Sequence, residues 1–343
     1  TKINNFYENE IVCVTGAGGS IGSEISKQIL KANISKLIIV DHSEINLYNI
    51  EKEILSLNNQ YKLHNIEIIK ILGSILEAQV IDQIFKEKPN YIFHAAAYKH
   101  VNMIEDNAII GIQNNIIGTL KLVDNAIKFK LKKFIFISTD KAVRPTSVMG
   151  YTKRIGEKYI ENLSYNKNTK FVILRFGNVI GSSGSVFALF KDQIEKKLPI
   201  TITHKDVTRY FMSVQEAVGL VLETSTNENN SNIIFLLNMG EPVKILDLAI
   251  KMVNLSGLTI KDKNNENGDI EFKYIGLKQG EKLHEELKFE ENFQLTNHKD
   301  IFSIPSKAVD TKFNQDLKKE IDLIIQLNSN DEAKIKLKKL SEN

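Results

Sequence analysis

The chain has 343 residues, enough to bury one large core or two modest ones. It is 42% hydrophobic and 25% charged, as in an ordinary globular protein, and no apolar stretch reaches the roughly 18 residues that a membrane-spanning helix needs. The net charge of +3 is too small to favour nucleic acid or a membrane surface as a partner. The one cysteine, Cys13, cannot form an internal disulfide, so we expect a reducing, cytoplasmic compartment.

The first predicted unit binds a dinucleotide. A β-rich run, Ile11–Thr15, leads into the loop GAGGSIG (16–22) and a helical pattern, and a second strand, Leu37–Val40, ends at Asp41. Glycines let backbone N–H groups approach a pyrophosphate, and a carboxylate about 20 residues further on accepts ribose hydroxyls. We expect NAD rather than NADP, because Asp41 would repel a 2′-phosphate. An ordinary glycine turn is the alternative.

Two further strands end in small or polar residues. Ile66–Leu72 leads to Ser74 and Ile75, and Tyr91–Phe93 leads to HAAA (94–97). Small residues there would let a cofactor lie across the strand ends. Close packing of a helix on the sheet explains the alanines equally well.

A long helix and a reactive cluster come next. Residues 109–129 predict a helix. We expect an asparagine in it, Asn114 or Asn115, to fasten the helix to the active-site strand through backbone hydrogen bonds. The apolar run Phe134–Ile137 then ends in Ser138, Thr139, Asp140 and Lys141. A hydroxyl, a carboxylate and an amine at the carboxyl end of a strand are a common arrangement for chemistry in an open α/β sheet. A solvated loop is the alternative, because Ser, Thr and Asp favour turns.

Strands and helices alternate up to about residue 175, which predicts an α/β fold with a Rossmann-like, doubly wound parallel sheet. Beyond it, the small-residue loop 181–186 opens a helix and is a second potential anion site. We expect Ser213 to cap a helix with Glu216 three positions on, and an amphipathic helix from Leu317 at the surface or in an oligomer contact. Further strands are predicted at Ile200–Thr203, Tyr210–Met212, Ile233–Leu237 and Ile270–Ile275.

The predicted division of the chain has three parts. Residues 1–175 form the NAD-binding domain, 176–310 a smaller substrate-binding lobe interleaved with the sheet, and 311–343 a helical tail.

From Ile11 to about Phe302 the chain resembles the extended short-chain dehydrogenase/reductase family. The glycine loop, Asp41, HAAA, NIIGT (115–119) and a Lys opening a long helix fall in family order. Longer motifs resemble one branch, the configuration-retaining, membrane-anchored bacterial UDP-N-acetylglucosamine 4,6-dehydratases, which start diacetamido-sugar synthesis for surface glycans and glycoproteins. These motifs are STDKAVRPTSVMGYTKR (138–154), RFGNVIGSSGSV (175–186), TRYFMS (208–213) and QGEKLHEE (279–286).

One departure from the wider family concerns its general base. The family carries a Tyr four residues before the helix Lys, and here that position is Met149, whose thioether cannot take a proton. Tyr151 lies only two residues before Lys153 and points to another face, since a helical turn takes about 3.6 residues. Either the chain is catalytically dead or another group accepts the proton. The branch that the chain resembles also has Met, so we expect residues 139–141 to do the proton work.

The resemblance implies a role for each candidate catalytic residue. Asp140 would serve the protons of the 4- and 6-hydroxyls, Lys141 the hydrogen at carbon 5, and Thr139 would hydrogen-bond the 4-oxygen. The division between Asp140 and Lys141 stays open. Lys141 can be a base only if burial or a positive neighbour lowers its pKa, and Lys153 is the candidate neighbour. Lys153 would also hold the nicotinamide ribose of a tightly bound NAD that is recycled.

The resemblance also implies the binding residues, and no metal site is expected. Asn178, the loop after it and Arg209 are candidates for the diphosphate, and Glu281 for the uridine ribose. His100 is either an acid or base or a solvated loop residue, and Arg144 either reaches a phosphate or braces its loop. The cofactor-binding candidates are Gly16, Gly18, Gly19, Ser20, Ile21, Gly22, Asp41, Ser43, Ser74, Ile75, Ala95, Ala96, Ala97, Asn115 and Lys153. The substrate-binding candidates are Lys99, His100, Arg144, Asn178, Ser182, Ser185, Val186, Thr201, Arg209 and Glu281.

Three other functions stay open. A 4-epimerase has the same fold but needs a Tyr base, so Met149 and the Asp140–Lys141 pair argue against it. An inverting dehydratase differs only at carbon 5. A non-catalytic NAD-binding sensor or scaffold would not need the Asp140–Lys141 pair. We also expect a homo-oligomer, and whether a membrane domain precedes Thr1 in the full-length protein stays open.

Overall fold

The structure, a computed structural model, describes residues 2–61, 66–163, 168–182, 184–227, 234–286, 293–305 and 312–342. Three sequence expectations therefore reach outside the described residues: Ser183 in the second small-residue loop, Ile233 at the start of a predicted strand, and the boundary at 310–311.

Within the described residues the fold is built on a nine-stranded sheet of order β15-β16-β11-β6-β5-β4-β1-β2-β3. The strands from β3 to β11 pair in parallel, and β16 and β15 add an antiparallel edge. The order 3-2-1-4-5-6 is that of a Rossmann sheet, so the predicted doubly wound fold is confirmed. The strands are β1 (Ile11–Thr15), β2 (Lys36–Asp41), β3 (Glu67–Leu72), β4 (Tyr91–His94), β5 (Lys133–Ile137), β6 (Lys170–Arg175), β11 (Ile234–Leu237), β15 (Gln294–Leu295) and β16 (Ile301–Ile304).

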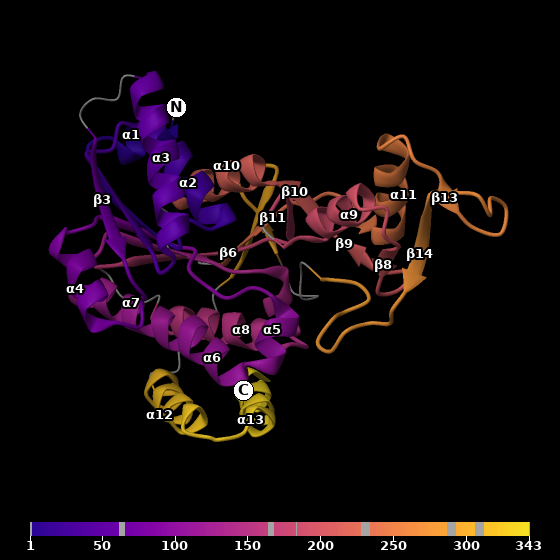
Figure 1. Cartoon of the computed structure of the whole chain (residues 1–343). Helices are drawn as coiled ribbons and strands as arrows, with labels where there is room; N and C mark the ends of the chain where they lie inside the picture. The colour runs from indigo at the N-terminus through magenta and orange to yellow at the C-terminus, as the bar shows by residue number, and fades with distance from the viewer. Residues whose placement is uncertain are drawn as a thin grey trace.

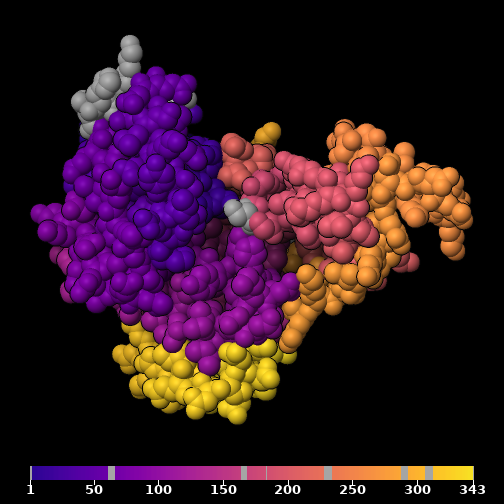
Figure 2. Space-filling model, in the orientation of Figure 1, coloured from indigo at the N-terminus to yellow at the C-terminus, as the bar shows by residue number. Residues whose placement is uncertain are grey.

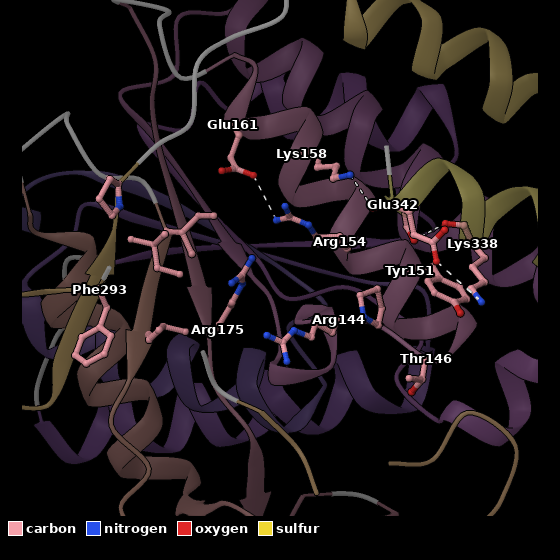
Figure 3. Close-up of a pocket in the computed structure, with 16 residues that line it drawn as sticks. Arg144, Thr146, Tyr151, Arg154, Lys158, Glu161, Arg175, Phe293, Lys338 and Glu342 are labelled. Atoms are coloured by element: carbon pink, nitrogen blue, oxygen red, sulfur yellow. Dashed lines mark hydrogen bonds and ion pairs between the residues drawn. The ribbon is translucent and has the colours of Figure 1, made fainter. Parts of the chain in front are cut away.

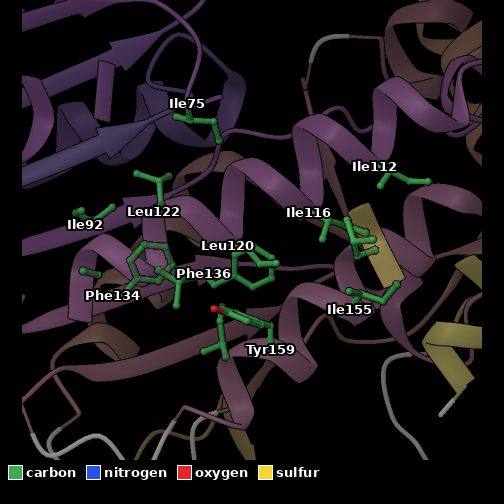
Figure 4. Packing of buried hydrophobic residues seen from close by; sticks show 14 of the residues in the cluster. Ile75, Ile92, Ile112, Ile116, Leu120, Leu122, Phe134, Phe136, Ile155 and Tyr159 are labelled. Atoms are coloured by element: carbon green, nitrogen blue, oxygen red, sulfur yellow. The ribbon is translucent and has the colours of Figure 1, made fainter. Parts of the chain in front are cut away.

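Helices cover both faces of the sheet (Figure 1). One face carries α1 (Lys2–Tyr7), α2 (Ser20–Ile29), α3 (Glu44–Tyr61) and α10 (Val214–Ser225). The other carries α4 (Ala78–Lys86), α5 (Val101–Asp106), α6 (Ala108–Ile112), α7 (Gly118–Lys128) and α8 (Val148–Glu161). Because both faces are buried, residues 11–14 of β1 and 134–137 of β5 are continuous apolar runs. Figure 4 shows Phe134 and Phe136 of β5 packed beside Leu120 of α7 and Tyr159 of α8.

The predicted long helix at 109–129 consists of α6 and α7 joined by a π-helical turn, Gln113–Ile117. Such turns insert one extra residue per turn and are frequent at functional sites. This one contains Asn115, whose contacts are described below.

A smaller lobe that contains residues 186–202 and 245–274 stands to one side of the main body, at the right of Figure 2. Its separate apolar core includes Phe190, Ile200 and Val253. Ser213 caps α10, since its Oγ accepts the backbone N–H of Glu216 at 3.1 Å, as predicted. The division at residue 175 stays a prediction, because β11 and β16 return to the main sheet. The remaining elements are β7 (Asn178–Ile180), α9 (Val186–Glu195), β8 (Ile200–Ile202), β9 (Thr208–Arg209), β10 (Phe211–Ser213), β12 (Val243–Lys244), α11 (Ile245–Leu255), β13 (Ile260–Lys261) and β14 (Ile270–Tyr274).

The tail forms α12 (Phe313–Ile325) and α13 (Asn330–Glu342), below α6 and α8 in Figure 1. The amphipathic helix predicted from Leu317 is confirmed, although α12 begins earlier, at Phe313. Leu317 and Leu337 are buried in the same core as α8, so the apolar face packs on this chain, and an oligomer contact stays a prediction. None of the described helices is both long and apolar enough to cross a membrane.

The tail offers a matched test of this packing. Replacing Leu337, which has 0% exposure, by alanine should lower the free energy of unfolding by about 2–5 kcal/mol, because it leaves a cavity under α13. The control is Ile335→Ala on the same helix, where the side chain is 71% exposed and little change is expected. Urea titration measures both, and equal effects would contradict the packing of α13 on α8.

Candidate active site

A cavity of about 740 Å³ opens where β1, β4, β5 and β6 end. The strand order reverses between β1 and β4, and open α/β sheets bind ligands outside the carboxyl ends of strands at such a point. Many of the predicted site residues line this cavity. They are Gly16, Gly18, Gly19, Ser20, Ile21, Gly22, Ala95, Ala97, Lys99, His100, Thr139, Lys141, Met149, Lys153, Asn178, Ser182 and Ser185.

The other predicted residues do not line the cavity. Ser74 donates its backbone N–H to Glu77, and Thr201 accepts a hydrogen bond from Gln193, so both contact local structure. Ile75 is buried beneath Gly118 of α7. The full set outside the lining is Asp41, Ser43, Ser74, Ile75, Ala96, Asn115, Asp140, Arg144, Val186, Thr201, Arg209 and Glu281.

The glycine loop after β1 packs tightly on one side and is open on the other. Gly16 has φ +68°, and a Cβ there would lie 2.7 Å from the backbone of Ala96. A Cβ on Gly22 would lie 2.0 Å from the Gly16 carbonyl oxygen. At Gly19, in contrast, that oxygen is the nearest described atom, at 3.3 Å. The loop therefore needs glycine for its own fold and leaves space over Gly19.

A substitution at Gly16 tests this close approach. Gly16→Ala combines left-handed strain with overlap against the Ala96 backbone, so the free energy of unfolding should fall by well over about 1 kcal/mol. Gly181→Ala is the control, because Gly181 also has a positive φ, +79°, but no described atom lies within 4 Å of the added Cβ. If chemical denaturation gives both variants the same loss, the overlap at Ala96 is wrong.

Asp41 ties this loop to the end of β2. Its Oδ2 accepts the Gly18 N–H and its Oδ1 accepts the Ser43 N–H, both at 2.9 Å. A carboxylate oxygen has lone pairs for a second donor, so these bonds leave capacity for hydroxyl groups. In the described structure no side chain caps the first turn of α2 at Gly19. The positive end of the α2 dipole therefore meets the cavity and fits an anionic diphosphate.

Asn115 fixes the loop after β4. Its side chain accepts from the Tyr98 N–H at 2.8 Å and donates to the Tyr98 carbonyl at 2.9 Å. It also donates to Thr152 of α8 at 3.1 Å. The two bonds to Tyr98 are bonds to the backbone, as expected for an asparagine in this helix, but they hold the loop after β4 rather than the active-site strand.

In the reactive cluster after β5, the acidic residue does not line the cavity. Thr139 and Lys141 line the cavity, whereas Asp140 is fully buried. The Thr139 hydroxyl donates to Asp140 Oδ1 at 2.8 Å, and Lys141 Nζ donates to the same oxygen at 3.0 Å. Lys141 Nζ also donates to Asn178 Oδ1 at 3.2 Å. Thr139 and Lys141 therefore lie between Asp140 and the cavity.

The expected lowering of the Lys141 pKa by Lys153 is wrong. Burial lowers the pKa of Lys141, but the carboxylates of Asp140 and Glu285 raise it more, so the pKa lies above its ordinary value. Lys153 instead donates to the Ile137 carbonyl at 2.8 Å, and burial lowers its own pKa to about 8. Lys141 is therefore charged at neutral pH in this arrangement.

A second cavity of about 650 Å³ lies on the other side of α8 (Figure 3). Tyr151 lines it, whereas Met149 lines the first cavity, which confirms that Tyr151 points to a different face. Arg144 also lines the second cavity and pairs with Glu286 at 3.1 Å. Of the two roles left open for Arg144, this contact matches the bracing of its loop.

The candidates for diphosphate and ribose contact each other. Arg209 donates to Glu281 at 3.0 Å, and Glu281 also accepts from Thr203 at 2.9 Å. On the cavity wall, a Cβ on Gly184 would lie 2.3 Å from the ring of His100. Burial and Lys99 lower the pKa of His100, so the ring is neutral at physiological pH.

The sequence interpretation missed three buried groups beside the site. His94 lies between the hydroxyls of Thr15 and Thr119, at 2.8 and 2.9 Å, and burial and Lys153 hold its pKa well below the usual range. Glu157 and Arg175 form a buried ion pair under Ser138, and Glu285 faces Lys141 at 3.7 Å. Glu285 belongs to the QGEKLHEE motif, the signal that could have found it. Among the described residues, no group of three His, Cys, Asp or Glu could hold a metal ion.

A family model described as "Polysaccharide biosynthesis protein" matches residues 12–306. The chain belongs to this polysaccharide biosynthesis protein family. Membership agrees with the motifs of an extended short-chain dehydrogenase/reductase. The chain is 42% identical to "Capsular polysaccharide biosynthesis protein CapD" of Staphylococcus aureus over 99% of its length, but covers 54% of CapD and 46% of a second curated relative. The chain thus spans about half the length of these relatives.

Two other similar proteins match this chain over most of its length and most of their own. A "UDP-glucose 4-epimerase" of Rickettsia rickettsii is 29% identical over 98% of this chain and 95% of its own length. The solved structure "Pen from Bacillus thuringiensis" is 32% identical with a TM-score of 0.76, and the match covers 89% of this chain and 92% of Pen.

Proposed function

We propose that the chain is an NAD-dependent 4,6-dehydratase that converts UDP-N-acetylglucosamine to its 4-keto-6-deoxy product with retention at carbon 5. The observation that carries this proposal is the cluster of Thr139, Asp140 and Lys141 at a cavity that also contains the glycine loop, with Met149 in place of a phenol. The family description and the name of CapD support a role in surface polysaccharide synthesis. The product would enter diacetamido-sugar synthesis.

The residues around β1 and β2 fit a dinucleotide. The open side of Gly19 and the N-terminus of α2 would hold the pyrophosphate, and Asp41 would accept ribose hydroxyls. Lys153 would hold the nicotinamide ribose. NAD, when bound, supplies a hydride acceptor for sugar carbon 4 and afterwards a hydride donor for carbon 6.

The chain's own residues would carry the protons. Thr139 Oγ would take the 4-hydroxyl proton and pass its own proton to Asp140 Oδ1, along the 2.8 Å hydrogen bond. Neutral Lys141 would then remove the hydrogen at carbon 5, which the 4-ketone has made acidic. Asp140 would return its proton to the departing 6-hydroxyl, which leaves as water. Lys141 would finally return its proton to carbon 5, so all protons balance.

This scheme requires Lys141 to lose a proton before it can act as a base. In the structure two carboxylates face its ammonium and raise its pKa. A change in charge around Lys141 must therefore precede catalysis.

A 4-epimerase is the second candidate, because a relative bears that name. Epimerisation needs one base at the 4-hydroxyl and no base at carbon 5. Met149 supplies no phenol beside Lys153, and Tyr151 lies at the other cavity. The Lys141–Asp140 pair would have no task in such a reaction, which favours the dehydratase.

Product mass separates these functions. Purified protein incubated with UDP-N-acetylglucosamine should yield a nucleotide sugar lighter by one water and carrying a ketone. A product of unchanged mass with altered stereochemistry at carbon 4 would show an epimerase. Bound NAD without any product would show a scaffold or sensor. Nuclear magnetic resonance of the product assigns carbon 5, and inversion there would contradict the retaining form.

A further inference from the structure

A segment of the smaller lobe, residues 278–286, is fastened to the loop between β5 and α8, residues 138–147. Thr146 Oγ donates to the Gly280 carbonyl at 3.1 Å, and Lys282 Nζ donates to the Val143 carbonyl at 2.8 Å. A Cβ on Gly280 would lie 2.8 Å from Ser147, so the two backbones are in close contact. The segment therefore has a fixed position beside Lys141, and it carries Glu285 to the inside.

Glu285 is a buried carboxyl with incomplete hydrogen bonding. It is 7% exposed, and its Oε1 lies 3.7 Å from Lys141 Nζ and 3.9 Å from Arg209 Nε. Its Oε2 is buried and has no hydrogen-bond partner among the residues that the structure describes. Most buried polar groups are hydrogen-bonded, so such an exception needs an explanation.

Charged side chains surround Lys141 and Glu285. Lys141 Nζ donates to Asp140 and Asn178, and Glu285 faces it at 3.7 Å, so oxygens surround the ammonium. Burial and Asp140 raise the pKa of Glu285, while Lys141, Arg209 and Lys282 oppose that rise. Glu285 therefore gains a proton more readily than an ordinary glutamate. Once it is neutral, it no longer attracts the ammonium form of Lys141.

We propose that Glu285 is a positioning residue that holds the Lys141 amine at the cavity wall and determines when that amine carries a proton. This inference rests on the proposed function in one respect: the dehydratase needs a neutral Lys141 to remove the hydrogen at carbon 5. Transfer of a proton from the Lys141 ammonium to the Glu285 carboxylate breaks an N–H bond, forms an O–H bond and leaves both groups neutral. The pair thus stores the proton without changing its net charge.

Acylation of Lys141 by acetic anhydride, followed by peptide mass spectrometry, reads its protonation without any turnover, because only the neutral amine reacts. Loss of one facing carboxylate should increase the neutral fraction, so Glu285→Gln should raise the labelling rate of Lys141 about tenfold at a fixed pH below its midpoint. Glu285→Asp keeps the charge and should restore a rate close to the wild type. Glu286→Gln is the matched control, because Glu286 pairs with Arg144 and should leave Lys141 labelling unchanged.

The outcomes separate this inference from the proposed function. Faster labelling in Glu285→Gln, with normal labelling in Glu285→Asp and Glu286→Gln, supports the inference even if no keto product is ever found. Equal labelling in Glu285→Gln and the wild type overturns it, even if the protein is an active dehydratase. If all three variants label faster, the segment has loosened, which also overturns the specific role of Glu285. Thermal unfolding of each variant shows whether the fold is retained.

Discussion

Replacing Lys141 by alanine should abolish dehydration of UDP-N-acetylglucosamine while NAD stays bound. The substitution removes the amine that meets Asp140 at the cavity wall, and loss of a general base costs at least about a hundredfold in rate. Asp41 and the glycine loop, which would hold the dinucleotide, bond to each other, whereas the Lys141 amine bonds to Asp140 and Asn178. Steady-state assays and the nucleotide released on denaturation measure the two effects separately.

The control for Lys141→Ala is Lys261→Ala, which removes one exposed lysine from β13 in the smaller lobe. It should change neither turnover nor bound nucleotide. A Lys141→Ala variant with the wild-type rate would show that the reaction does not need the Lys141 amine. A variant that loses both NAD and turnover would place Lys141 in cofactor binding instead.

Replacing Glu157 by glutamine should cause the largest loss of stability. Glu157 is fully buried, accepts two hydrogen bonds from Arg175 at 2.7 and 2.6 Å, and accepts one from Ser138 at 2.7 Å. The Glu157→Gln substitution would deprive the Arg175 guanidinium, which is 1% exposed, of this carboxylate, and breaking such a pair costs about 3–5 kcal/mol. Urea titration of wild type and variant measures the difference.

A surface pair provides the control. Glu195 pairs with Lys191, and both side chains are more than half exposed, so Glu195→Gln should cost less than about 1 kcal/mol. The burial of Glu157 would be contradicted by equal losses in the two variants.

The stability loss in Glu157→Gln should also depend on pH. Burial raises the pKa of Glu157, but Arg175, Arg154 and Ser138 lower it more, so the folded-state pKa lies below the ordinary value. The stabilisation is present above the unfolded-state pKa of about 4.3 and is lost as the pH falls through the folded-state pKa. The difference in unfolding free energy between wild type and variant should therefore shrink on acidification below about pH 4. A difference that grows on acidification would contradict the lowered pKa of Glu157.

Much of the sheet could be predicted, because buried parallel strands are short apolar runs that end in glycine or polar residues. Ile11–Thr15 has the predicted bounds, and the strand predicted at Tyr210–Met212 is shifted by one residue, to Phe211–Ser213. The edge strands β15 and β16 were missed. They span two and four residues, and β16 joins the sheet by pairing with β11, far away in sequence, which local periodicity does not register.

The site could be predicted where its residues follow the ends of strands. It was harder to predict where residues far apart in sequence come into contact. Strand geometry alone brings Gly16, Ala95 and Thr139 to one cavity. Whether a polar side chain faces that cavity depends on packing, so the burial of Asp140 behind Thr139 could not be read from the spacing. Glu285 meets Lys141 only because the 278–286 segment folds back, and no local pattern encodes that contact.

The central claim is that Lys141 and Asp140 together perform the proton work of a missing phenol. Its most direct test is the reaction of UDP-N-acetylglucosamine with the purified protein in D₂O, followed by mass spectrometry and nuclear magnetic resonance of the product. The expected product has lost one water, carries a ketone at carbon 4 and has deuterium at carbon 5, because the Lys141 amine exchanges its protons with solvent. A sugar of unchanged composition with hydrogen retained at carbon 5 would contradict the claim.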